Sequence, residues 1–208
     1  MASEVGICNS ALQLIKNTKY ISSLTQGGKE ADACEDTYPE LRDFILEHHD
    51  WNFARRRVVL SRLGDTYAPA FGFTYAYSLP SDLLSMRGLF ANSRGTGDVE
   101  FSREGAQINT DAEDLYLLYT ARVADPNLMS ASFRQALAKL LSSRLASALN
   151  NNVSLSQALY NQYLDEDLPS AQGVDSIQQR PQQRPESSWV SVRESAQDTR
   201  HLNGGWSS

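Results

Sequence analysis

The side chains best suited to acid–base chemistry stand in one short run, Glu47 to Asp50, which reads Glu-His-His-Asp. Histidines and carboxylates are the usual general acids and bases of enzymes. At helical spacing, four consecutive side chains point around the whole circumference and cannot face one substrate together. The sequence also fixes no nucleophile near them. We therefore predict a structural role for this run and no catalytic residue in the chain.

Motifs for metal ions and phosphates are weak. Cys8, Cys34 and the three histidines lack the paired spacing of a tetrahedral zinc site. The acidic run 111–114 lacks the regularly spaced oxygen ligands and the internal glycine of an EF-hand calcium loop. It is typical of a solvated turn. The run 93–98 has two glycines but no Gly-Lys-Ser/Thr, so it does not predict a phosphate-binding loop. We expect no metal and no cofactor, and two cysteines that act as small buried hydrophobic residues in a reducing compartment.

Three consecutive arginines, Arg55, Arg56 and Arg57, form the most concentrated charge in the sequence. Their functional interpretation is contact with a neighbouring subunit or with DNA in a channel. The alternative is a solvated helix end, where cations interact favourably with the helix dipole. The whole chain has 19 Lys and Arg against 25 Asp and Glu, a formal net charge of −6. Because sequence-specific DNA binding normally comes with a basic face, we do not expect it here.

The C-terminal segment 171–208 differs in composition from the rest. It is rich in Gln and Ser and contains the repeat QQRPQQRP, so it supplies few residues for a core. It nevertheless contains Trp189 and Trp206, and tryptophan is enriched at the energetic centres of protein interfaces. We predict an extended tail that docks on a partner. The alternative is a solvated end with incidental indole rings.

Apolar residues at spacings of three and four predict the helices that must position these segments. The predicted helices cover residues 3–16, 31–48, 130–150 and 155–168. Pro39 removes a backbone donor from the second helix, so we expect a kink or a restart there. Ser154 and Gln157 fit a capping box at the start of the last helix, and Pro169 is expected to end it. These helices should pack as an antiparallel bundle.

Between the second and third helices the pattern changes to alternation. Aromatic and small residues alternate over 71–78, which predicts a half-buried strand. Further short strands are predicted at 84–90, 99–102, 107–109 and 115–123, and together they could form a small antiparallel sheet. Trp51 and Phe53 are expected to anchor the helical part to this sheet.

The predicted fold class is therefore α+β, mainly helical, with an antiparallel helix bundle and a small β-sheet insertion. The predicted divisions are N-terminal bundle helices at 1–62, a β-rich insertion at 63–125, C-terminal bundle helices at 126–170 and the tail at 171–208. Hydrophobic residues make up 41% of the 208 residues, which excludes collagen-like, wholly disordered and polytopic membrane classes. No stretch has the features of a signal peptide or a membrane span, so we expect synthesis in a cytoplasm.

Several segments together resemble the tail tubular protein A type of head-to-tail adaptor, found in short-tailed bacteriophages. The similarity covers about residues 3–193 and is most specific in DWNFA at 50–54 and YAYSLP at 75–80. The segment SSWVSVR at 187–193 resembles a segment near the C-terminus of such proteins. The resemblance is a whole-chain pattern and not a catalytic signature.

This resemblance implies a structural virion protein without catalysis or a cofactor. It implies a dodecameric ring of copies of the chain between the portal and the tail tube or nozzle, extending a channel in which genomic DNA makes only passive contact. In such proteins the bundle builds the ring, the sheet faces the next tail component, and the C-terminal segment binds the portal. The portal-binding residues carried over are Trp189, Val190, Val192 and Arg193. Trp206 lies beyond the matched part and is added for its chemistry alone.

Two other classes of function stay open at this point. A peptidoglycan-cleaving tail enzyme would need two carboxylates in a cleft, one with a raised pKa, and Glu47 with Asp50 is the available pair. A nucleic-acid-binding accessory protein would need a basic face. For the ring, we hypothesise that the acidic residues face the channel, so that DNA slides without adhering. We expect the isolated chain to be a monomer that assembles on a portal.

Overall fold

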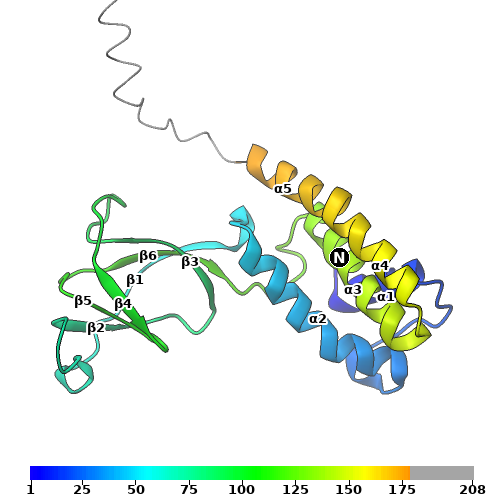
Figure 1. Ribbon diagram of the computed structural model, residues 1–208, viewed down its shortest axis with the longest axis horizontal. Helices are drawn as coiled ribbons and strands as arrows, with labels where there is room; N and C mark the ends of the chain where they lie inside the picture. The colour runs from blue at the N-terminus through cyan, green and yellow to red at the C-terminus, as the bar shows by residue number, and fades with distance from the viewer. Residues whose placement is uncertain (179–208) are drawn as a thin grey trace, which may run out of the picture. The chain divides into compact units, whose positions relative to one another are not determined.

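The structure, a computed structural model, describes residues 1–178. The chain divides into two units after Gln178. The first unit combines helices with two small antiparallel sheets, which confirms the predicted α+β class (Figure 1). Within residues 1–178, no helix has the length and apolar character needed to cross a membrane. The predicted portal-binding residues lie outside the described residues: Trp189, Val190, Val192, Arg193 and Trp206.

The first three predicted helices lie close to their predicted ranges. Ser3 and Ser130 start α1 and α3, because each hydroxyl accepts a backbone N–H three residues further on, at 3.0 and 3.2 Å. The α-helices are α1 (Glu4–Leu14), α2 (Lys29–His48), α3 (Ala131–Asn150), α4 (Val153–Gln162) and α5 (Leu168–Ile177). A π-helical turn, Tyr163–Asp167, joins α4 to α5, and short 3₁₀ turns cover Leu24–Gln26, Asn52–Ala54 and Asp65–Tyr67.

Pro39 does not make α2 restart. The helix runs without a break from Lys29 to His48, with the exposed proline ring inside it. On the opposite side, Tyr38 and Leu41 are buried in the core beside Cys34 and Ile45. Packing of both halves against the same core compensates for the one hydrogen bond that proline cannot donate.

Two predicted boundaries near the C-terminal helices are wrong. α4 begins after Asn152, whose side-chain oxygen accepts the Leu155 N–H at 3.0 Å, so the cap is not the predicted Ser154. Pro169 lies in the first turn of α5 and does not end the helical run, because proline is tolerated where its N–H would have no helical partner. The predicted tail therefore starts too early. Ala171 and Asp175, both assigned to it, are buried in α5.

The strands form two three-stranded antiparallel sheets where one was predicted. One sheet has the order β1-β6-β3 and the other has the order β2-β5-β4. The strands are β1 (Arg55–Val59), β2 (Tyr75–Ser78), β3 (Leu83–Phe90), β4 (Phe101–Glu104), β5 (Gln107–Thr110) and β6 (Tyr116–Ala121). The chain beyond β1 links the sheets, since Leu63 donates to the Ala76 carbonyl and Ser78 donates to the Ser61 carbonyl.

The arginine run belongs to a strand and not to a helix end. Arg55, Arg56 and Arg57 pair in register with Thr120, Tyr119 and Leu118 of β6. The sheet thus begins inside the range 1–62 that was assigned to bundle helices. The extended conformation of these arginines depends on pairing with a strand about 60 residues further along the chain. The run itself lacks the alternation of apolar and polar residues that would predict a strand. β2 is also shorter than predicted, because Gly72 takes a left-handed φ of 92° before it.

Each group of elements has its own core. The helical core joins α1, α2, α3, α4 and α5, and it includes the free cysteines Cys8 and Cys34, which are buried as predicted. The smaller strand core includes Leu60, Tyr77, Ile108, Leu115, Leu117, Tyr119 and Ala121. Each fully buried large apolar side chain contributes roughly 1.5–3 kcal/mol. His48 and Ala148 are exposed at the last turns of α2 and α3.

Trp51 is a central residue of the helical core. It is fully buried, its indole N–H donates to the Ile45 carbonyl at 2.9 Å, and its ring meets Phe133 of α3 edge-on. Phe53 packs on the same Phe133 ring. The two aromatics thus anchor the end of α2 to α3, and not to the sheet as predicted. The strand β3 meets the helical region through the Arg87 hydrogen bond to the Glu47 carbonyl and through Leu84, which packs on the helical core.

Candidate functional site

The three arginines of β1 do not form one basic patch. Arg55 pairs with Asp50 at 2.7 Å, and Arg56 pairs with Asp82 at 3.0 Å. Successive side chains of a strand point to opposite faces, so Arg56 lies on the other face from Arg55 and Arg57. Arg57 is exposed and lines a pocket of the sheet that is described below. Because Arg55 and Arg56 already form ion pairs within the chain, Arg57 is the best candidate of the three for contact with another subunit or with DNA.

The acid–base run is not assembled into one cleft. Glu47 lines a cavity of about 490 Å³ between α2, α3 and α4, together with Glu40, Phe44 and Tyr160. Asp50 is not among the lining residues, and its carboxylate binds Arg55. The ring nitrogen Nδ1 of His48 lies 2.7 Å from the carbonyl of Phe44 in its own helix. The two carboxylates proposed for a glycosidase thus do not face a shared cavity.

A polar cluster that the sequence reasoning missed fixes α5 to the end of α2. The Asn52 backbone N–H donates to both carboxylate oxygens of Asp175, at 3.1 Å each. The Asn52 side-chain amide donates to the Asp175 carbonyl at 2.6 Å and to one carboxylate oxygen at 3.1 Å. His49 Nε2 lies 3.7 Å from the same carboxylate. We name this set of contacts, formed by His49, Asn52 and Asp175, the α5 clamp.

Asp175 of the α5 clamp is only 1% exposed. Burial raises the pKa of its carboxyl group above the ordinary aspartate value, and the negative charge of Asp50 acts in the same direction. The Asn52 N–H, His49 and Arg55 oppose this shift. A signal was present in the sequence, because Leu168, Ala171 and Asp175 continue the helical spacing past Pro169. The predicted helix ended at Pro169, so the sequence did not predict that Asp175 contacts Asn52.

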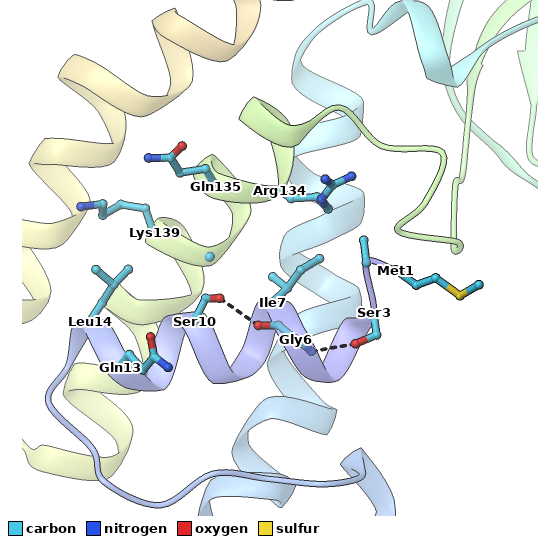
Figure 2. Close-up of a pocket in the computed structure, with 12 residues that line it drawn as sticks. Met1, Ser3, Gly6, Ile7, Ser10, Gln13, Leu14, Arg134, Gln135 and Lys139 are labelled. Atoms are coloured by element: carbon cyan, nitrogen blue, oxygen red, sulfur yellow. Dashed lines mark hydrogen bonds between the residues drawn. The ribbon is translucent and has the colours of Figure 1, made fainter.

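A groove of about 750 Å³ runs between α1 and α3, and Figure 2 shows its lining side chains. Its residues are small or polar at many positions, such as Gly6, Ser10 and Ala138. Its two cations are already engaged. Arg134 donates to the carbonyls of Pro126 and Met129, and Lys139 contacts Gln162 and Asp167. The groove therefore offers a surface for another chain segment rather than a constellation of reactive groups.

A second hollow lies at one end of the sheet β1-β6-β3, with a volume of about 230 Å³. We name it the sheet pocket. Its lining combines apolar side chains with two arginines and comprises Arg57, Val58, Val59, Phe90, Asn92, Ser93, Arg94, Gly95, Tyr116, Leu117 and Leu118.

The remaining motifs have structural roles. Asp111, from the acidic run 111–114, accepts hydrogen bonds from the N–H and the hydroxyl of Thr74 at 2.8 and 2.7 Å. In the turn that contains the run 93–98, the Asn92 side chain bonds Arg94 and Thr96. No group of three or more His, Cys, Asp or Glu side chains within residues 1–178 could hold a metal ion.

Comparison with known proteins adds no relative to this description. No model of a known protein family matches the sequence, and no curated protein matches it.

Proposed function

We propose that this chain is a structural virion protein, a subunit of a dodecameric head-to-tail adaptor ring in a short-tailed bacteriophage. The ring would lie between the portal and the tail tube or nozzle and extend the DNA channel. The proposal starts from the resemblance of residues 3–193 to tail tubular protein A adaptors. One structural observation carries it further: the α5 clamp uses Asn52, from the most specific segment of that resemblance.

The α5 clamp supports a role for the tail because of where it sits in the chain. Asp175 lies three residues before Gln178, after which residues 179–208 follow with both predicted docking tryptophans. The clamp fixes α5, the last helix of the described residues, to the end of α2. A ring of such subunits would present the segment repeatedly to one portal, and multivalency makes modest single contacts effectively permanent.

The charge of α2 supports a channel role for the helical region. This helix carries seven acidic residues against Lys29 and Arg42. Five of the acids are exposed on its surface: Asp32, Glu35, Asp36, Glu40 and Glu47. We propose that this face lines the channel. Like-charge repulsion would then keep the DNA backbone from adhering during its passage.

The test is light scattering of the purified chain mixed with the portal from the same virion. The full chain is compared with a chain that ends at Gln178. It is also compared with the full-length double variant Trp189→Ala/Trp206→Ala, which tests the two tryptophans without shortening the chain. Ending at Gln178 keeps Ala171 and Asp175, which are buried, so the body stays intact. We expect the full chain to join the portal, and both altered chains to lose most of that binding.

Two results would contradict parts of the proposal. If the full chain fails to join the portal, the adaptor function is wrong. If the chain ending at Gln178 binds the portal as well as the full chain does, the adaptor function is supported and the proposed docking of the tail is wrong. A peptidoglycan zymogram covers the enzymatic alternative, which predicts a clearing zone that is lost in Glu47→Gln.

A further inference from the structure

The loop between β1 and β2 exposes an unusual amount of apolar surface. Its sequence from Gly64 to Phe73 is GDTYAPAFGF. Phe71 is 89% exposed and Tyr67 is 62% exposed. Exposed aromatic side chains are typical of interaction sites. This loop is therefore a candidate for contact with a partner that offers a matching hollow.

The sheet pocket has the shape for one aromatic side chain. Val59, Tyr116 and Phe90 are neighbours across β1, β6 and β3 and so share a face of the sheet. The Phe90 ring lies over Gly88, where a methyl group would meet it at 2.7 Å. The hollow thus depends on a glycine that leaves room for the ring to fold back. Its volume of about 230 Å³ accommodates a phenyl ring.

Charges at the two surfaces are complementary. Arg57 and Arg94 line the sheet pocket, and within residues 1–178 neither forms an ion pair. The loop carries one acid, Asp65, whose side chain is 98% exposed and contacts Arg62 only at 3.6 Å. A phenyl ring with a carboxylate nearby is the chemistry that an apolar pocket edged by two guanidinium groups recognises.

We propose that the sheet pocket binds the loop 64–73 of a second copy of this chain, with Phe71 in the pocket and Asp65 beside Arg57 and Arg94. The loop and the turn 91–98 beside the pocket lie on opposite sides of the strands (Figure 1). The contact is therefore head-to-tail. A heterologous contact of this kind repeats from copy to copy and forms a ring if the rotation closes. The closing of such contacts into a ring rests on the proposed adaptor function, whereas the contact between two copies does not.

Cross-linking of the full chain tests this contact directly. One chain carries Ala70→Cys, an exposed position that leaves the Phe71 ring in place, the other carries Val59→Cys, and a short bis-maleimide joins cysteines that meet. We expect at least ten times more cross-linked dimer than in a mixture where Val153→Cys replaces Ala70→Cys. Val153 is 71% exposed on α4 and serves as the matched control. Cys8 and Cys34 are fully buried in every chain. Cross-linking captures brief contacts, so it is informative even when most of the protein is monomeric.

Two further variants decide between a specific contact and chance collision. Gly88→Ala in the Val59→Cys chain should reduce the yield to the control level, since it pushes the Phe90 ring from its place. Arg94→Asp should also lower the yield, and Asp65→Arg on the other chain should restore it. Equal yields with Ala70→Cys and Val153→Cys overturn the proposal. This result is independent of portal binding, so the two proposals can fail separately.

Discussion

The helical region and the strand region of this chain differ in charge balance and in the size of their apolar cores. Residues 1–54 and 123–178 carry 14 acidic and seven basic residues, whereas residues 55–122 carry eight of each. The helices share one large apolar core, whereas the strands share a smaller one, and the loop between β1 and β2 leaves the aromatic side chains of Tyr67 and Phe71 in solvent. We infer that stability resides mainly in the helices and recognition mainly on the strands.

The largest expected effect on stability is that of Trp51→Ala in the helical core. The change removes a fully buried ring, its contact with Phe133 and its hydrogen bond to the Ile45 carbonyl. We expect a loss of about 3–5 kcal/mol in the free energy of unfolding. Chemical denaturation measures it, with Phe71→Ala in the strand region as the control that should change little. A loss below about 1 kcal/mol for Trp51→Ala would refute the assignment of stability to the helices.

A smaller effect is expected at the α5 clamp. Asp175→Ala removes the carboxylate that accepts from the half-buried backbone N–H and side-chain amide of Asn52, and leaves the amide only its bond to the backbone carbonyl of residue 175. We expect a loss of about 1–3 kcal/mol, measured by the same denaturation experiment. Hydrogen exchange should also show faster opening of α5 than of α3. Unchanged exchange in α5 would mean that the clamp does not hold this helix.

The same carboxyl group predicts a dependence on pH. The pKa of Asp175 in the folded chain is raised by burial. The protonated form therefore favours folding, and this contribution is complete below the unfolded value of about 3.9. It is lost as the pH rises through the raised value. Relative to Asp175→Asn, which cannot titrate, the unaltered chain should lose stability across that interval. A constant difference between the two chains over the interval contradicts the raised pKa.

In the strand region, Gly88→Ala should cost about 1 kcal/mol or less. The added methyl meets the end of the Phe90 side chain, which can rotate away, and not the backbone. The variant separates recognition from stability, since it should leave the melting temperature nearly unchanged while it abolishes the loop contact. A loss as large as that of Trp51→Ala would show that this face supports the fold itself.

The smallest effect on stability is expected from Glu35→Lys/Glu40→Lys on the exposed face of α2. Both side chains are exposed, so unfolding should change by about 0.5 kcal/mol or less. Binding of double-stranded DNA at low salt should rise in the variant and disappear at moderate salt. If the unaltered chain already binds DNA as strongly as the variant, the acidic face does not keep DNA from adhering.

The sequence predicted the helices well because their apolar residues repeat locally. α1, α2 and α3 lie within a few residues of their predicted ranges. β1 escaped prediction because its partner β6 lies 60 residues away, and the run Arg55 to Arg57 has no alternation of its own. α5 escaped because Pro169 was taken as a stop, although proline fits a first helical turn.

The candidate sites were less predictable than the fold. The α5 clamp joins Asn52 to Asp175 across 123 residues, which no local pattern specifies. The sheet pocket depends on the Phe90 ring lying over Gly88, a tertiary detail. The predicted portal-binding residues, among them Trp189 and Trp206, lie outside the described residues and stay a prediction.

The mass of the complex between the full chain and its portal, measured by light scattering, tests the adaptor most directly. We expect a mass that exceeds that of the portal ring by twelve copies of the chain, and no added mass when the chain ends at Gln178. A complex that keeps the mass of the portal alone in the presence of excess full chain would contradict the adaptor function.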